Sequence, residues 1–248
     1  MKKHIPNLIT CCNVLCGTLS IFFALKDYWL LAAWLVVLAM VFDFFDGFAA
    51  RLLHVRSELG KELDSLADVV SFGVVPALLA HFLIARVSEE GESREFILSC
   101  FPVLIAAFSA YRLAKFNLDT RQTYSFIGVP TPANALFWVC LVFSYYYQQS
   151  WFTSCWGNPW LLVVCVLCFS WLLISEIPMF SLKFTSFAWS ANRVRYLYFV
   201  TLLLTVIVLG GKILSFIIPL YILFNLVDYL YSRLKPDQNE QNRNREKR

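Results

Sequence analysis

The chain has 248 residues, of which 59% are hydrophobic and 15% charged, and its formal net charge is +4. Soluble domains are roughly 45–50% apolar and 25% charged, so the composition excludes an ordinary soluble protein and indicates a polytopic membrane protein. The small net charge gives no reason to expect a nucleic-acid partner, and membrane lipids are the expected surroundings.

In chain order, eight apolar runs approach the length of about 20 residues that a membrane-spanning helix needs. They lie at 8–25, 28–50, 63–86, 95–116, 131–149, 159–182, 195–210 and 213–231. The first run lacks a small-residue cleavage motif, so we expect a retained helix. The sequence therefore predicts an all-α bundle of about eight transmembrane helices. It forms one membrane-embedded domain, residues 1–232, and is followed by a polar tail, residues 233–248, that we expect to be disordered.

Lysine and arginine are distributed unevenly between the predicted loops. If the N-terminus is cytoplasmic, 17 of the 21 Lys and Arg residues fall on that side, as the positive-inside rule requires. Both termini are then cytoplasmic. We expect a multi-pass protein of the cell (inner) membrane.

Four aspartates lie near the cytoplasmic ends of the second and third runs. Asp43 and Asp46 are three residues apart, and Asp64 and Asp68 are four apart, so each pair lies on one face of a helix. If the two helices pack antiparallel through the short loop 52–62, the four carboxylates face one another. Each intramembrane carboxylate costs about 2.5–3.5 kcal/mol on insertion scales, so something must relieve the cost of this cluster.

Divalent cations between the carboxylates would relieve that cost. Hard ions such as Mg²⁺ and Mn²⁺ take oxygen ligands, and a pair of bridged metals is a common clamp for displacement at phosphorus. We therefore predict two divalent cations, Mg²⁺ or Mn²⁺, held by Asp43, Asp46, Asp64 and Asp68.

Residues between the aspartates favour a phosphate ligand. Gly47 allows a ligand to approach the backbone closely, and Arg51, one turn beyond, can pair with a phosphate through two hydrogen bonds. Gly60 would weaken a helix interior by roughly 1 kcal/mol, which favours a position in a loop or at a helix start. We expect the active site to face the cytoplasm.

The complete pattern resembles the signature of the CDP-alcohol phosphatidyltransferase family. All eight signature positions match, and they are Asp43, Asp46, Gly47, Ala50, Arg51, Gly60, Asp64 and Asp68. The resemblance implies a helical membrane enzyme with two metals, which displaces CMP from a CDP-linked lipid with an alcohol hydroxyl. It also implies that the first three aspartates hold the ions, and that Asp68 acts as the catalytic base while also touching metal.

The resemblance implies a donor site as well. The family carries nucleotide contacts at the glycine, at the arginine and at a hydroxyl six residues later, which here are Gly47, Arg51 and Ser57. Asn7 and Thr10 complete the set expected to line the CDP part of bound CDP-diacylglycerol.

Stretches before, at the end of and after the signature resemble the phosphatidylserine synthases of this family. They are "PNLITCCNVLCG" (6–17), "SLADVVSFGVVPA" (65–77), "YRLAKFNLD" (111–119) and "FIGVPTPANA" (126–135). L-serine is therefore the expected acceptor, with Arg112, Lys115 and Asn117 expected to bind it. The chain departs from this subfamily at Tyr111, where the subfamily has alanine, and at Lys115, where it has arginine.

Two other functions are weighed against this one. The first is the same chemistry on another alcohol, glycerol 3-phosphate or inositol phosphate, for which Arg112, Lys115 and Arg121 would supply a basic pocket. The second is a divalent-cation transporter, which would need acidic residues along a path through the bilayer. The notable acids elsewhere, Glu176 and Asp228, trace no such path. We expect a homodimer that transfers the phosphatidyl group of CDP-diacylglycerol to L-serine.

Overall fold

The computed structural model describes residues 4–55, 57–88, 93–118, 126–179 and 189–234, and this part of the chain is almost entirely helical. The expected all-α fold is therefore confirmed. The helices are α1 (His4–Ala24), α2 (Trp29–Leu52), α3 (Glu58–Asp68), the π-helical turn η1 (Val69–Val74), α4 (Val75–Val87), α5 (Ser93–Cys100), α6 (Val103–Leu118), α7 (Thr131–Tyr147), α8 (Gln149–Trp156), α9 (Pro159–Ile174), α10 (Trp189–Leu209), the 3₁₀ helix η2 (Gly210–Phe216) and α11 (Ile217–Leu234). Two short strands, β1 (Phe126–Ile127) and β2 (Pro178–Met179), pair antiparallel.

Several of these helices are long and apolar enough to cross a membrane. In the described residues there are five such stretches, or six if α8 and α9, bent by 74°, form one broken span. The five stretches are His4–Ala24, Trp29–Leu52, Glu58–Val87, Phe96–Leu118 and Tyr196–Tyr231. The last stretch contains both of the final two predicted helices, and α7, with 17 residues, is not among the five. A polytopic membrane protein is confirmed, and the count of eight stays a prediction.

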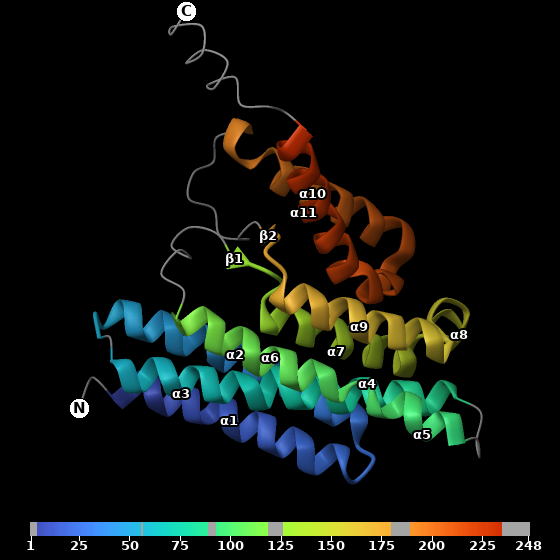
Figure 1. Cartoon of the computed structure of the whole chain (residues 1–248), viewed down its shortest axis with the longest axis horizontal. Coiled ribbons are helices and arrows are strands. Elements are labelled where there is room, and N and C mark those ends of the chain that lie inside the picture. The colour runs from blue at the N-terminus through green and yellow to red at the C-terminus, as the bar shows by residue number, and fades with distance from the viewer. Residues whose placement is uncertain (1–3, 56, 89–92, 119–125, 180–188, 235–248) are drawn as a thin grey trace, which may run out of the picture.

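The first three helices pack together, as Figure 1 shows in blue and teal, and α2 and α3 carry the four aspartates. α1 and α2 form a hairpin in which the Ser20 hydroxyl donates to the Ala32 carbonyl at 2.8 Å. η1 packs against α1 and α6 through small residues. A Cβ at Gly17 would clash with Ser71, and one at Gly73 would lie 3.1 Å from the Ser109 Cβ. Small residues are the usual way in which membrane helices approach closely.

The helix that carries Asp64 and Asp68 begins earlier than the apolar run that predicted it. Ser57 caps it, because its Oγ accepts a hydrogen bond from the Gly60 N–H at 3.0 Å. The first turn is polar, and hydropathy therefore does not detect it. After Asp68 the chain continues without a break into η1, where the Val75 N–H donates to the Val70 carbonyl. Such π turns are rare and occur frequently at functional sites.

The expected helix 159–182 is wrong for residues 175–179, because α9 ends at Ile174, and residues 180–182 lie outside the described residues. The end of α9 and the residues after it hold the segment before α7: the Gly128 N–H donates to the Ile177 carbonyl at 2.9 Å, and the Val129 N–H donates to the carbonyl of Leu172, in the last turn of α9, at 3.1 Å. Gly128 has φ 75°, and a Cβ there would lie 2.8 Å from the Leu173 carbonyl oxygen. Only glycine fits this turn without strain.

The last two helices form a separate layer. Figure 1 shows α10 and α11 lying over α7 and α9, at an angle to the other helices. They pack on each other through Tyr198, whose ring centroid lies 6.0 Å from that of Tyr221 and 5.9 Å from that of Phe224. Residues 235–248, which contain most of the tail predicted to be disordered, lie outside the described residues.

Candidate active site

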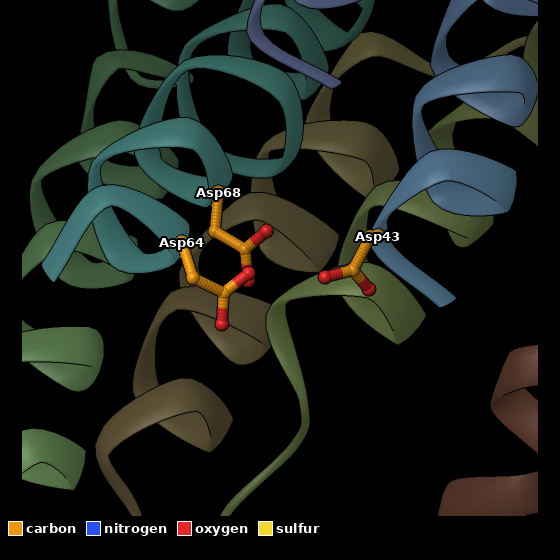
Figure 2. A group of neighbouring side chains, drawn as sticks. All are labelled: Asp43, Asp64 and Asp68. Carbon is orange, nitrogen blue, oxygen red and sulfur yellow. The ribbon is translucent and has the colours of Figure 1, made fainter. Parts of the chain in front are cut away.

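Three of the four signature aspartates point toward one another across the seam between α2 and α3 (Figure 2). One carboxylate oxygen from each of Asp43, Asp64 and Asp68 lies within 4.8 Å of the other two. Asp68 is buried, and the Asp64 Oδ1 is a buried atom that has no hydrogen-bond partner among the described residues. The expected convergence of the aspartates is thus seen, although α2 and α3 are brought together mainly because both pack on α1. The result is a concentration of negative charge at a partly buried place.

Asp46 lies close to this cluster and is held by α1. It is 7% exposed, and its charge acts on both Asp64 and Asp68. The Thr10 hydroxyl donates to the Asp46 Oδ2 at 2.7 Å. Thr10 was expected to touch the nucleotide, and in the structure its hydroxyl orients a predicted metal ligand.

Asn13 is a second residue of α1 that reaches the cluster. Its Nδ2 donates to the Asp68 Oδ1 at 3.4 Å, and its backbone carbonyl accepts from the Ser71 hydroxyl at 3.1 Å. Sequence reasoning did not assign it a role in the site. The spacing of Asn7, Thr10 and Asn13, each three residues from the next, places all three on one helix face and would have been the signal.

A cavity of about 510 Å³ opens beside the aspartates, between α1, the end of α2 and the start of α3. Its lining includes four of the five residues predicted to bind the CDP moiety, namely Asn7, Thr10, Gly47 and Ser57, together with Asp46 and Asp64. The fifth, Arg51, is exposed, and its Nη1 would lie 3.9 Å from a Cβ at Gly47. A phosphate placed over Gly47 would therefore be within reach of the guanidinium.

Gly60 lies at the start of α3, as expected from its helix-weakening effect. A Cβ there would lie 2.9 Å from the Ser57 Oγ and 3.0 Å from the Asn7 Oδ1, so a larger residue would push α1 and α3 apart. Lys61 also lines the cavity, which the sequence did not predict. Its Nζ donates to the Asn117 carbonyl at 2.8 Å and so ties the end of α6 to α3.

The three residues predicted to bind the acceptor have different surroundings. Arg112 is buried, its charge attracts Asp68, and its Nη1 donates to the Thr131 Oγ1 at 3.3 Å. Lys115 lies with its Nζ 3.6 Å from the Glu176 Oε1. Asn117 donates from Nδ2 to the Ser65 Oγ at 2.9 Å. Of the three, Arg112 is the one that the structure brings to the aspartates.

Comparison with known proteins agrees with this geometry. The family model described as CDP-alcohol phosphatidyltransferase matches residues 3–217. The chain belongs to the CDP-alcohol phosphatidyltransferase family. Among similar proteins of this family is the CDP-diacylglycerol–serine O-phosphatidyltransferase of Helicobacter pylori, 30% identical over 93% of this chain and 92% of the relative. Proteins of the same name from Bacillus subtilis and Mycobacterium leprae are 34% and 35% identical over 71% of this chain, and they are covered over 89% and 57% of their own lengths.

The aspartates of this family member fit a divalent metal. The donor set consists of carboxylate oxygens, which are the ligands that Mg²⁺ and Mn²⁺ prefer. One oxygen each from Asp43, Asp64 and Asp68 converge, and the Asp64 Oδ1 has no hydrogen-bond partner among the described residues, so it has lone pairs available for a cation. A cation there would offset the repulsion between the carboxylates.

Proposed function

We propose that this phosphatidyltransferase transfers the phosphatidyl group of CDP-diacylglycerol to the hydroxyl of L-serine, forming phosphatidylserine and CMP. The observation that carries the proposal is the convergence of Asp43, Asp64 and Asp68 beside a cavity lined by the predicted donor residues. Support for serine comes from the names of the similar proteins and from the buried Arg112 next to Asp68.

The cofactors proposed are two divalent cations, Mg²⁺ or Mn²⁺, held by Asp43, Asp46, Asp64 and Asp68. When bound, they would neutralise the cluster and stabilise the negative charge of the pyrophosphate during displacement. Thr10 and Asn13 would keep Asp46 and Asp68 oriented through the hydrogen bonds described above.

The chain's own residues then divide the work between donor and acceptor. Asn7, Thr10, Gly47, Arg51 and Ser57 bind the CDP part of the donor. Arg112, Lys115 and Asn117 hold the serine, with Arg112 placed to pair with its carboxylate.

Asp68 acts as the base in this scheme. As the serine oxygen attacks the β-phosphorus, which bears the diacylglycerol, its proton passes to Asp68. The bond from that phosphorus to the CMP oxygen breaks, and CMP leaves. The contact of Asn13 with Oδ1 leaves Oδ2 of Asp68 for the proton.

The proposed setting is the cell (inner) membrane, with the active site facing the cytoplasm and the chain acting as a homodimer. The charge distribution supports the orientation, because in the predicted eight-helix topology 17 of the 21 Lys and Arg residues fall on the aspartate side. Serine and CMP are both polar, so a site near a membrane surface can take serine from the aqueous phase and release CMP to it, while the diacylglycerol part of the donor stays in the lipid.

One assay tests the acceptor. Purified protein is given CDP-diacylglycerol, Mn²⁺ and, in separate reactions, labelled serine, glycerol 3-phosphate and inositol phosphate, and lipid product is separated from free label. Label entering lipid from serine alone is the expected result. Label entering from glycerol 3-phosphate or inositol phosphate instead would show that the acceptor is wrong, and metal uptake into vesicles without any CMP release would favour a transporter.

A further inference from the structure

Four buried polar side chains on α6 and α7 form what we name the α6–α7 polar cluster: Ser109, Arg112, Thr131 and Asn134. Ser109 and Arg112 are three residues apart on α6, and Thr131 and Asn134 are three apart on α7, so each pair shares one face of its helix. The hydrogen bond from Arg112 to Thr131 joins the two faces. Ser109, Thr131 and Asn134 are 0% exposed, and Arg112 is 7% exposed.

Most of the hydrogen-bonding capacity of this cluster is unused. Within the part of the chain that the structure describes, the Ser109 Oγ, the Arg112 Nε, and both Nδ2 and Oδ1 of Asn134 are buried without a partner. Buried polar groups in proteins are nearly always paired, because an unpaired one destabilises the fold. A buried asparagine with neither end of its amide satisfied therefore indicates a ligand that supplies the missing partners.

The position of the α6–α7 polar cluster next to the aspartates suggests that the missing ligand is the acceptor. Arg112 and Asp68 attract each other, and η1, which directly follows Asp68, packs against both α6 and α7. The donor cavity is lined by α1, α2, α3 and the loop between the last two. The donor cavity and the cluster are therefore formed by different helices. A displacement at phosphorus brings the attacking oxygen in from the side opposite the leaving group, so the cluster is where the acceptor belongs.

We propose that Asn134, together with Arg112, binds the amino-acid end of the acceptor and thereby selects serine over alcohols that lack it. This inference rests on the proposed function. Serine brings a carboxylate, which the Arg112 Nε and Nη2 can bind side-on, and an ammonium, which needs acceptors. The amide of Asn134 offers both an acceptor for the ammonium, in Oδ1, and a donor for the carboxylate, in Nδ2. Sequence reasoning named Arg112 for this role and did not name Asn134.

The test compares Asn134→Leu with a matched control. Leucine has nearly the shape of asparagine and no hydrogen-bonding atoms. The control is Ser144→Ala, because Ser144 is also buried on α7 with an unpartnered hydroxyl but lies about 15 Å further along the helix at 1.5 Å per residue. CMP release is measured with serine varied at saturating CDP-diacylglycerol, and with CDP-diacylglycerol varied at saturating serine.

Asn134→Leu is expected to raise the KM for serine about 10- to 100-fold, the effect of losing one hydrogen bond to a charged group. The KM for CDP-diacylglycerol should stay within about twofold, and Ser144→Ala should match the wild type. Without serine, Asn134→Leu should unfold at or above the wild-type Tm, since it loses no hydrogen bond, and added serine should no longer raise that Tm. An unchanged KM for serine overturns the inference, as does a fall in Tm with both KM values raised.

The two proposals fail in distinguishable ways. If the wild-type protein makes lipid from another alcohol and not from serine, the proposed function is wrong, whatever Asn134→Leu does. If the wild type uses serine and Asn134→Leu uses it with the same KM, the proposed function stands and the role of Asn134 is refuted.

Discussion

The hydrogen bond from Thr10 to Asp46 makes a quantitative prediction about metal binding. The Thr10 Oγ1 lies 2.7 Å from the Asp46 Oδ2 and 3.1 Å from the Pro6 carbonyl oxygen. The single hydroxyl hydrogen is directed mainly to Asp46, which is the closer acceptor and is charged. Thr10→Val removes the hydroxyl with little change in volume and leaves the Asp46 carboxylate, only 7% exposed, with one partner fewer.

The size of the effect follows from the type of bond lost. A hydrogen bond to a charged group contributes about 1.5–3 kcal/mol, and each 1.4 kcal/mol is a factor of about ten in a binding constant. A ligand carboxylate that is no longer oriented should therefore bind metal about 10- to 100-fold more weakly, which is also the range typical for lost partners of metal ligands.

The assay is CMP release as a function of Mn²⁺ concentration. In Thr10→Val the half-saturating Mn²⁺ concentration should rise about 10- to 100-fold, and kcat should recover at saturating metal. Thr10→Ser keeps the hydroxyl and should stay close to the wild type. Thr153→Val, which removes the hydroxyl bonded to the Gln149 carbonyl on α8, is the control for a lost threonine hydroxyl away from the site. A wild-type metal dependence in Thr10→Val would refute the reasoning that this hydroxyl orients Asp46.

Two further predictions concern the metal and the nucleotide. Asp43→Asn or Asp64→Asn should abolish CMP release, because a neutral amide replaces a carboxylate poorly between divalent ions. EDTA should abolish CMP release by the wild type as well. Full activity in EDTA would eliminate the hypothesis that the reaction needs divalent metal. Arg51→Ala should raise the KM for CDP-diacylglycerol more than the KM for serine, since the guanidinium lies beside Gly47 at the donor cavity; equal increases in both KM values would count against this assignment.

The sequence predicted the helical core of the fold because membrane helices are encoded locally. Long apolar runs identified α1 and α2 closely, and the third run, 63–86, covers most of the continuous stretch formed by α3, η1 and α4. The breaks were harder to predict. The run that suggested one helix over 95–116 is divided at Phe101 and Pro102, and α8 leaves the line of α9 by 74° near Gly157. Hydropathy records how apolar a segment is, and it does not record the direction in which the chain leaves a proline or a glycine.

In the candidate site, too, features set by spacing along one helix were predictable, whereas contacts between helices were not. The spacing of Asp64 and Asp68 along one helix was enough to predict that they share a face. The contacts of Arg112 with Thr131, and of Lys115 with Glu176, join residues far apart in the chain. No periodicity encodes them, because they depend on how α6, α7 and the end of α9 pack. Asn134 could not be predicted as a site residue, because its role depends on this packing and a lone asparagine near the start of a helix is a common sequence feature.

Asp68→Asn tests most directly whether the aspartate cluster performs the transfer. The rate of phosphatidylserine formation and the binding of CDP-diacylglycerol are measured on the same preparation of this variant. Because three carboxylates remain to hold metal, donor binding should be retained. The loss of the base should lower kcat by about 10²–10⁴-fold. Phosphatidylserine formation at the wild-type rate in Asp68→Asn would contradict the account.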